Sequence, residues 1–123
     1  YETINDKVKL FDKCVYFNYF QRPAEEQGET INIQKIDSKV ALENLMVVNE
    51  VLKPNKIIFV SSKAHRNFVE HVRLEQKEQL PFVDAVPHPS ASAWWNRKAK
   101  KYGLNGMTAT GKEKFQRIMT KTI

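Results

Sequence analysis

The run KIIFV at residues 56–60 constrains the fold more strongly than any other part of this sequence. It is short, apolar almost throughout, and separated from the preceding segment by the helix-breaking pair Pro54–Asn55. An uninterrupted apolar run of this length is typical of a strand buried on both faces in a parallel sheet. We therefore expect an α/β fold built around this strand.

Helical patterns lie on both sides of this run. A helix capped at Asp37 or Ser38 is predicted to continue to about Lys53, and a second helix is predicted over residues 62–79, before Pro81. The first helix has one apolar stripe at the spacing i, i+4, i+7, i+11. The residues of this stripe are Ala41, Leu45, Val48 and Leu52.

Two further strands and a last helix complete an alternating order. The stretches CVYFNYF (14–20) and FVDAV (82–86) are predicted strands, and Thr110-x-x-Glu113 is a capping box for the last helix. The order strand, helix, strand, helix, strand, helix predicts a single α/β domain over residues 1–123. Its expected architecture is a parallel sheet flanked by helices in three layers, α/β/α.

The positive charge is concentrated in the last third of the chain. The net charge is +6, and residues 88–123 alone contain eight basic residues and one acidic residue. A one-sided basic surface favours a polyanionic partner, with nucleic acid as the first candidate, while the alternative is a solvated lysine-rich helix. The side chains suited to phosphate contacts without sequence readout are Arg97, Lys98, Lys100, Lys101, Lys112 and Lys114.

Composition narrows the setting of the protein. The single cysteine, Cys14, excludes a disulfide within the chain and favours a reducing compartment, so we expect a cytoplasmic or nucleoid-associated protein. No run is long enough to span a membrane. The first residue is Tyr1 and not Met, which suggests a piece of a longer polypeptide. No cofactor motif is present, and His65 and His71 lie about 240° apart on a helix, so they cannot share a metal ion.

The stretch VPHPSASAWW (86–95) carries the first candidate site residue, because ligands of parallel α/β sheets bind beyond the carboxyl ends of the strands. His88 follows the third predicted strand and is held between Pro87 and Pro89, whose rings restrict the backbone. A rigidly held imidazole can donate a hydrogen bond to developing negative charge. The alternative is a histidine in a stiff turn.

Other side chains near the strand ends are also candidates. The Asn18 amide offers a donor and an acceptor, which suits the edge of a nucleobase, although it could equally pair with a neighbouring backbone group. Ser90 and Ser92 could bind phosphate oxygens or cap a helix. Trp94 and Trp95 could stack on bases, or one of them could belong to the core.

Taken together, these segments resemble the later part of the uracil-DNA glycosylase superfamily. VYFNYFQRP resembles the strand whose asparagine recognises uracil, and IIFVSSKAH resembles the next strand and its turn. HPSAS resembles the family's His-Pro-Ser loop, which presses on the DNA minor groove, and GMTATGKEKFQRI resembles the segment that leads into the last helix. The resemblance implies hydrolysis of the N-glycosidic bond of uracil or a related base in DNA.

The resemblance also implies roles for single residues. Asn18 would recognise the base, His88 would stabilise the charge that grows on uracil O2, and Ser90 would contact a phosphate. In the family, a leucine near the end of the His-Pro-Ser loop fills the space left by the flipped base. Here Ser92 stands in that part of the loop, and Trp94 or Trp95 is the candidate wedge.

One part of the family pattern has no counterpart in this chain. The family's first motif, a loop with Gly and Pro that positions the attacking water, is not found before Asn18. We therefore expect an incomplete glycosylase-like fold, the carboxyl-terminal portion of a longer protein, with little or no activity alone. An incomplete sheet also favours pairing with a second copy.

Two other interpretations stay open, namely a non-catalytic nucleic-acid-binding module and an α/β protein-interaction domain without DNA function.

Overall fold

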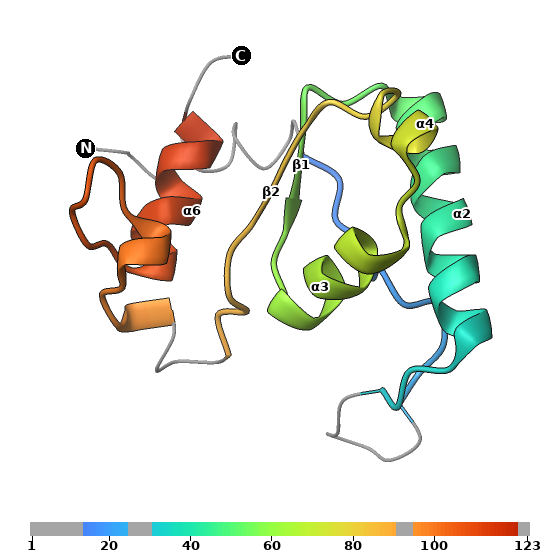
Figure 1. Ribbon diagram of the computed structural model, residues 1–123, viewed down its shortest axis with the longest axis horizontal. Helices are drawn as coiled ribbons and strands as arrows, with labels where there is room; N and C mark the ends of the chain where they lie inside the picture. The colour runs from blue at the N-terminus through green and yellow to red at the C-terminus, as the bar shows by residue number, and fades with distance from the viewer. Residues whose placement is uncertain (1–13, 25–30, 91–94, 121–123) are drawn as a thin grey trace.

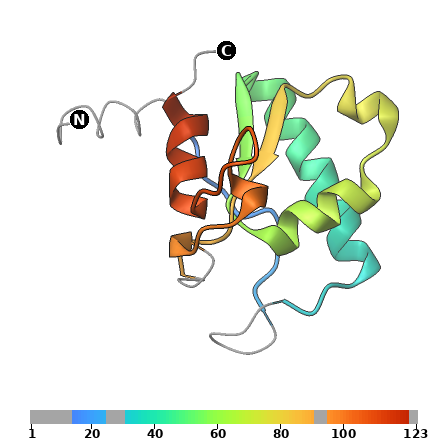
Figure 2. The ribbon, with the colours of Figure 1, turned by 60° about the vertical axis from the view of Figure 1, so that its left-hand side comes forward.

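The computed structural model describes residues 14–24, 31–90 and 95–120, and within them the fold is a mixed α/β arrangement. A two-stranded sheet lies in the middle, with α6 on one side and with α2 and α3 on the other (Figures 1 and 2). The elements in chain order are α2 (Lys35–Leu52), β1 (Lys56–Phe59), α3 (Ser62–His71), α4 (Leu74–Lys77), β2 (Phe82–Ala85), the 3-10 helix η1 (Lys100–Tyr102) and α6 (Gly111–Thr120).

The two strands pair in parallel, as predicted. Lys56 lies opposite Phe82 and Phe59 lies opposite Ala85. The ladder continues one step beyond the strands, because the Val86 N–H donates to the Phe59 carbonyl at 2.8 Å. The crossover between the strands runs through α3 and α4, as parallel pairing requires a long connection. The α/β class and the parallel sheet are therefore confirmed.

The predicted strand at residues 14–20 is wrong. Residues 14–18 have no regular secondary structure, and a bend follows at Tyr19 and Phe20. Val15 and Tyr16 are 67% and 77% exposed. A strand is stabilised by a hydrogen-bonded neighbour, and in the described part of the chain β1 pairs with β2 alone. Strand propensity without such a neighbour does not produce a strand.

The predicted helix over residues 62–79 is also interrupted. α3 ends because Val72 adopts an extended backbone with φ −68° and ψ 134°, and its side chain packs against the core. The chain then re-enters a helix at α4, where the Gln76 side chain accepts the Arg73 N–H at 2.8 Å. The chain therefore leaves the helical conformation at Val72 while this half-buried side chain stays against the core.

The first helix begins earlier than predicted. Its N-cap is Gln34, and Asp37 lies in the first turn, where its carboxylate accepts the Gln34 N–H at 2.7 Å. Arg22 donates to both carboxylate oxygens of Asp37, at 2.7 and 2.8 Å, and also to the Asn32 carbonyl. The Arg22 hydrogen bond and the Gln34 N–H lower the pKa of Asp37. This partly buried ion pair anchors α2 to the segment that precedes it.

The main core lies between the sheet, α2 and α3. Its centre is aromatic, because the Phe59 ring lies 5.4 Å from Tyr19 and 5.0 Å from Phe68 between ring centroids. Burial raises the pKa of Tyr19 to about 12. The Tyr19 hydroxyl donates to Asn67, whose amide in turn donates to Ser38 at 2.9 Å. The buried members are Tyr19, Ala41, Leu42, Leu45, Phe59, Ala64 and Phe68.

The last helix is capped as predicted. The Thr110 hydroxyl accepts the Glu113 N–H at 3.0 Å, and the Glu113 carboxylate accepts the Thr110 N–H at 3.0 Å. These hydrogen bonds lower the pKa of Glu113. Two lysines attach α6 to the sheet, since Lys56 Nζ donates to the Ile118 carbonyl and Lys114 pairs with Asp84. Among the described helices, none has the length and apolar character needed to cross a bilayer.

Candidate nucleic-acid interface at the carboxyl edge of the sheet

A hollow of about 520 Å³ lies beyond the carboxyl end of β2, and we call it the carboxyl-edge hollow. This is the edge at which ligands of parallel α/β sheets bind. Four elements contribute to its wall, namely α3, β2 with the residues that follow it, η1 and α6. The lining residues include Ser62, His65, Arg66, Asp84, Pro87, Lys101, Tyr102 and Lys114.

His65 lines this hollow and is partly buried. Its ring lies 5.5 Å from Phe59 and 6.4 Å from Phe68 between centroids, so one side of the imidazole packs on the core. Burial lowers the pKa of His65, the charge of Asp84 raises it, and that of Lys114 lowers it further. The imidazole is therefore neutral at pH 7.

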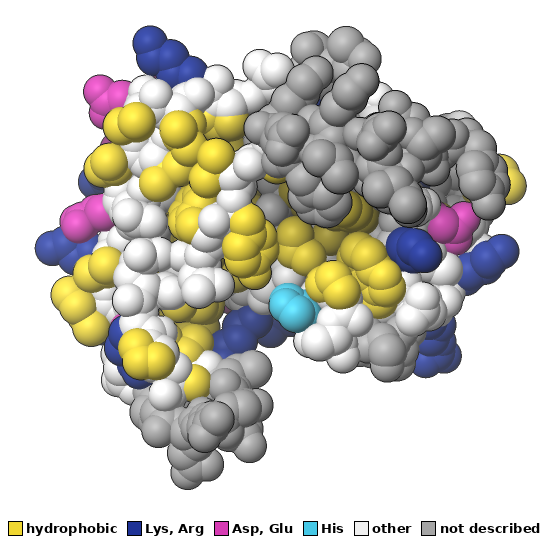
Figure 3. Space-filling model, turned by 180° about the vertical axis from the view of Figure 1, so that it is seen from behind, with side chains coloured by type: hydrophobic (Ala, Val, Ile, Leu, Met, Phe, Trp, Pro, Cys, Tyr) yellow, Lys and Arg dark blue, Asp and Glu magenta, His cyan; other side chains and the backbone are white. Residues whose placement is uncertain are grey.

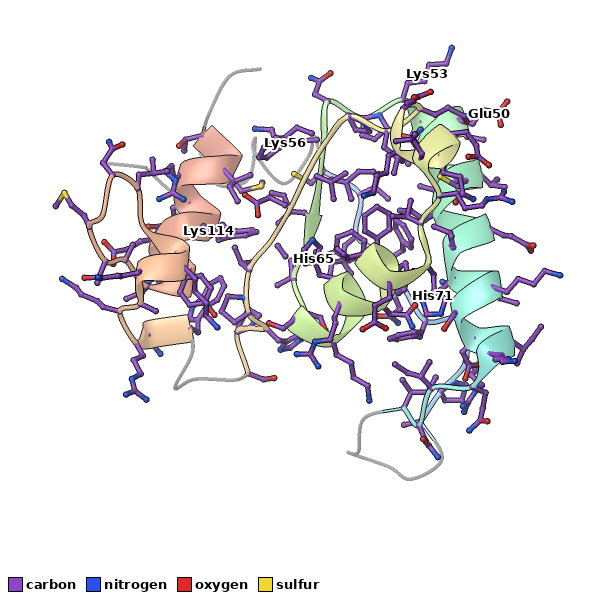
Figure 4. The ribbon with its side chains drawn as sticks, viewed as in Figure 1. Glu50, Lys53, Lys56, His65, His71 and Lys114 are labelled. Atoms are coloured by element: carbon purple, nitrogen blue, oxygen red, sulfur yellow. The ribbon has the colours of Figure 1, made fainter. Side chains whose placement is uncertain are left out.

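An ion pair closes the hollow on the side of α6. Lys114 Nζ lies 2.8 Å from Asp84 Oδ1, and the two side chains are 13% and 31% exposed. The Ala85 N–H also donates to Asp84 Oδ1, at 2.7 Å. His65 and Lys114 come from helices on opposite sides of β2 (Figure 4). The pair therefore fixes α6 against the strand end that precedes His88.

The loop after β2 holds His88 in a defined tautomer. The Ser90 N–H lies 3.0 Å from His88 Nδ1, and the Ser90 hydroxyl lies 2.6 Å from the same atom. A backbone N–H can only donate, so Nδ1 is the acceptor and the proton of the neutral imidazole lies on Nε2. His88 is exposed. The loop thus presents an N–H donor to solvent at the carboxyl edge of the sheet.

Of the predicted serines and tryptophans, Ser90 and Trp95 lie within the described residues. The Ser90 hydroxyl, predicted to contact phosphate, is engaged with His88 while remaining exposed. Ser92 and Trp94 lie outside the described residues. The Trp95 ring lies 5.8 Å from Phe115 of α6, and the side chain is half-buried. Trp95 therefore packs on the last helix.

Basic side chains follow this loop directly. Arg97, Lys98, Lys100 and Lys101 are all exposed. Lys101 Nζ lies 5.0 Å from the centroid of the Tyr102 ring, and Tyr102 is itself buried at the wall of the hollow. Arg66 on α3 and Lys101 both line the hollow, and their positive charges suit phosphate groups.

Asn18 lies in a second hollow of about 570 Å³, formed by residues 15–23 and one face of α2. We call it the α2 hollow. Its wall is largely apolar, and no described residue forms a hydrogen bond with the Asn18 side-chain amide. His88 lines neither hollow, and Asn18 does not line the carboxyl-edge hollow. The described structure therefore does not bring the two predicted site residues together in either hollow.

Ser61 and His71 form hydrogen bonds with residues close by in the sequence. Ser61 caps α3, because its hydroxyl accepts the Ala64 N–H at 3.3 Å, whereas the exposed Ser62 lines the carboxyl-edge hollow. His71 Nδ1 lies 2.9 Å from the Asn67 carbonyl of the same helix. Within the described ranges, no cluster of three or more metal-ligating side chains is formed.

Several residues of the carboxyl-edge hollow were not predicted as site residues, among them His65, Arg66, Asp84 and Tyr102. His65 lies in the first turn of α3, which follows the apolar run of β1, and that position was a usable signal. Asp84 and Lys114 are far apart in the sequence, and no local pattern predicts their contact.

No protein-family model, no curated protein and no solved structure matches the chain. The geometry of the two hollows and the loop between Pro87 and Ser90 is therefore the basis for a functional assignment.

Proposed function

We propose that this chain is the carboxyl-terminal portion of a DNA base-excision enzyme that hydrolyses the N-glycosidic bond of uracil or a related base. Its fold would be an incomplete three-layer α/β/α domain of the uracil-DNA glycosylase type. The observation that supports this most directly is the tautomer of His88, whose Nδ1 accepts two hydrogen bonds from Ser90.

The chemistry requires a donor that is neutral before the reaction and oriented in advance. When the glycosidic bond breaks, negative charge develops on the leaving base. The Nε2–H of His88 can donate to that charge without first gaining or losing a proton. Ser90 prevents the ring from rotating to the opposite orientation, so the donor is preorganised.

The surroundings of His88 suit a DNA backbone. The exposed cations at positions 97–101 begin a few residues after the loop, and Arg66 lies across the carboxyl-edge hollow. Contacts of this type neutralise phosphates and position the duplex without reading its sequence. A base flipped from the stack would then be presented to the donor.

Asn18 would recognise the edge of the flipped base through its side-chain amide, which makes no hydrogen bond within the described residues. This role requires that the rest of the protein, or bound DNA, brings Asn18 in the α2 hollow and the exposed His88 into one site. The residue that activates water would also come from outside this chain. The chain alone is therefore expected to release base slowly or not at all.

A release assay with uracil- and mismatch-containing oligonucleotides tests the proposal, using the full-length protein. His88→Ala should lower the rate of base release by about 10²- to 10³-fold, the usual cost of removing one donor to a developing anion. His71→Ala is the matched control, because His71 is an exposed histidine on α3 that bonds to its own helix.

Two outcomes would contradict the proposal. The first is no release of any base by the full-length protein, and the second is an unchanged rate in His88→Ala. Salt-sensitive DNA binding without release would instead favour a non-catalytic nucleic-acid-binding module. In the described structure neither hollow contains both Asn18 and His88, and this favours that second candidate. Failure to bind nucleic acid at low salt would favour an α/β protein-interaction domain.

A further inference from the structure

Cations from three elements line the carboxyl-edge hollow, namely Arg66 of α3, Lys101 of η1 and Lys114 of α6. Lys114 pairs with Asp84 at 2.8 Å. Arg66 forms no ion pair with any described residue, although Glu70 lies one helical turn away and lines the same hollow. The Arg66 guanidinium can therefore bind an anion from solution without breaking an ion pair of the described fold.

The rest of the wall suits a tetrahedral oxyanion. Ser62 is exposed and adds a hydroxyl donor, while a guanidinium can bind two phosphate oxygens through parallel hydrogen bonds. Val86, Pro87 and Tyr102 are buried and form an apolar part of the wall, where charges interact more strongly than in bulk water. The volume of about 520 Å³ lies within the usual range of small-ligand sites, about 300–1,000 Å³. There is therefore room for a phosphate group and for part of the molecule that carries it.

His65 lies next to these cations in the wall of the hollow. It directly precedes Arg66, and its ring packs against Phe59 with 5.5 Å between centroids. Burial lowers the pKa of His65, the charge of Asp84 raises it, and that of Lys114 lowers it. In the view from behind, lysine or arginine side chains lie beside the histidine at the surface, and acidic side chains lie toward the margins (Figure 3). Because burial and the cation oppose protonation, the imidazole is neutral at pH 7.

The charged and titratable groups that line the hollow together with His65 come from four elements. They are Arg66 and Glu70 of α3, Asp84 of β2, Lys101 and Tyr102 of η1, and Lys114 of α6. A phosphate bound beside Arg66 would add negative charge near the imidazole and favour its protonated form. Proton uptake and phosphate binding would then strengthen each other, because such a coupling acts equally in both directions.

We propose that the carboxyl-edge hollow binds a phosphate group through Arg66 and Lys101, and that His65 takes up a proton as the phosphate binds. Binding is therefore weak at pH 7.5 and becomes stronger as the pH falls through the pKa of His65. The site differs from that of His88, which does not line the hollow. The inference does not rest on base excision, because it requires neither His88 nor Asn18.

Nuclear magnetic resonance of the imidazole Cε1–H groups tests this, since the chain has three histidines and gives three signals. Sulfate is the probe, because it remains a dianion between pH 5 and pH 8, and sodium chloride keeps the ionic strength constant. Sulfate should raise the pKa of His65 and leave that of His71 unchanged, because His71 does not line the hollow. The affinity for sulfate should be about fivefold higher for protonated than for neutral His65, at the lower end of usual couplings. His65→Gln assigns the signal and should remove this pH dependence.

Two substitutions test the cationic donors. Arg66→Gln and Lys101→Gln should each weaken sulfate binding about tenfold, the usual effect of losing one hydrogen bond to a charged group. Both side chains are exposed, so the fold should tolerate the changes. Arg73→Gln and Lys77→Gln are the matched controls, because these exposed residues do not line the hollow.

A thymidine pentanucleotide separates two sources of the phosphate group. If it raises the pKa of His65 at a concentration at least tenfold below that of sulfate, the hollow binds the backbone of a nucleic acid. If sulfate acts and the pentanucleotide does not, the hollow binds a small phosphorylated molecule. Either result supports an oxyanion site in the hollow.

Three results would overturn this inference. The first is an unchanged pKa of His65 in sulfate, and the second is an equal rise for all three histidines, which indicates no specific site. The third is full sulfate binding by both Arg66→Gln and Lys101→Gln. Base release without any sulfate effect would reject this site alone, whereas a sulfate effect without base release would reject only the base-excision proposal.

Discussion

Single residues at the carboxyl edge of the sheet combine a structural and a chemical role, and His65 illustrates this. Its ring packs on Phe59 and Phe68 while its edge faces the hollow with Asp84 and Lys114. Burial holds its pKa below the usual value of 6.5. The unfolded chain therefore binds a proton more readily than the folded chain as the pH falls.

This shift predicts an acid-sensitive contribution to stability. The contribution of neutral His65 is fully present above pH 6.5 and is lost as the pH falls through 6.5 toward the lower pKa of the folded state. We expect the free energy of unfolding to fall more steeply between pH 7.5 and 5.5 in wild type than in His65→Gln. At pH 7.5 the substitution itself should cost about 1 kcal/mol through lost packing.

Urea denaturation at the two pH values measures this difference. His71→Gln serves as the control, because His71 is exposed and lies on the same helix. Parallel pH profiles for wild type and His65→Gln would show that burial of His65 has no energetic consequence.

Individual elements differ in how their ends are determined. α6 begins at a reciprocal capping box between Thr110 and Glu113, whereas α3 ends where Val72 turns to an extended backbone and packs against the core. The first signal is local and the second is tertiary. Because the capping box is a local feature, it can be mutated without disturbing the core.

Thr110→Ala should remove the cap of α6 and destabilise the protein by about 1 kcal/mol, the usual effect of losing a hydroxyl N-cap. Thr110→Ser keeps the hydroxyl and should stay close to wild type. Chemical denaturation followed by circular dichroism compares the two variants. Equal stability of Thr110→Ala and Thr110→Ser would argue that the hydroxyl hydrogen bond does not support α6.

The difference between local and tertiary signals also explains how much of the fold could be predicted from the sequence. The apolar run of β1, the strand β2 and the capping box of α6 depend on short patterns, and all three were predicted close to their observed positions. The strand at residues 14–20 was not observed, since a strand also requires a neighbouring strand. Residue types predicted His88 as a candidate, but its tautomer and the wall of the hollow depend on contacts that only the folded chain contains.

The whole molecule carries its charge unevenly. Residues 1–87 are nearly balanced, while the excess of positive charge follows the loop at His88 and lies beside the carboxyl-edge hollow. Such an arrangement would attract DNA from solution and orient the sheet edge toward it. Binding of this kind depends strongly on salt, because phosphate contacts release counterions.

We expect the logarithm of the DNA association constant to fall linearly with the logarithm of the salt concentration. Lys100→Ala should reduce the slope by about one, as expected for one lost phosphate contact. Lys77→Ala on α4 is the charge-matched control and should leave the slope unchanged. Fluorescence anisotropy with a labelled duplex measures both slopes, and equal effects of the two substitutions would place DNA elsewhere on the surface.

The parallel pairing of β1 and β2 has a consequence for how this protein is made. β1 leaves the ribosome first, yet its partner strand follows only after α3 and α4 have been synthesised. Until Ala85 and Val86 emerge, the apolar residues of β1 lack the partner strand that they have in the described residues. The nascent chain therefore passes through an interval in which its most hydrophobic strand depends on chaperones or on early packing against α2.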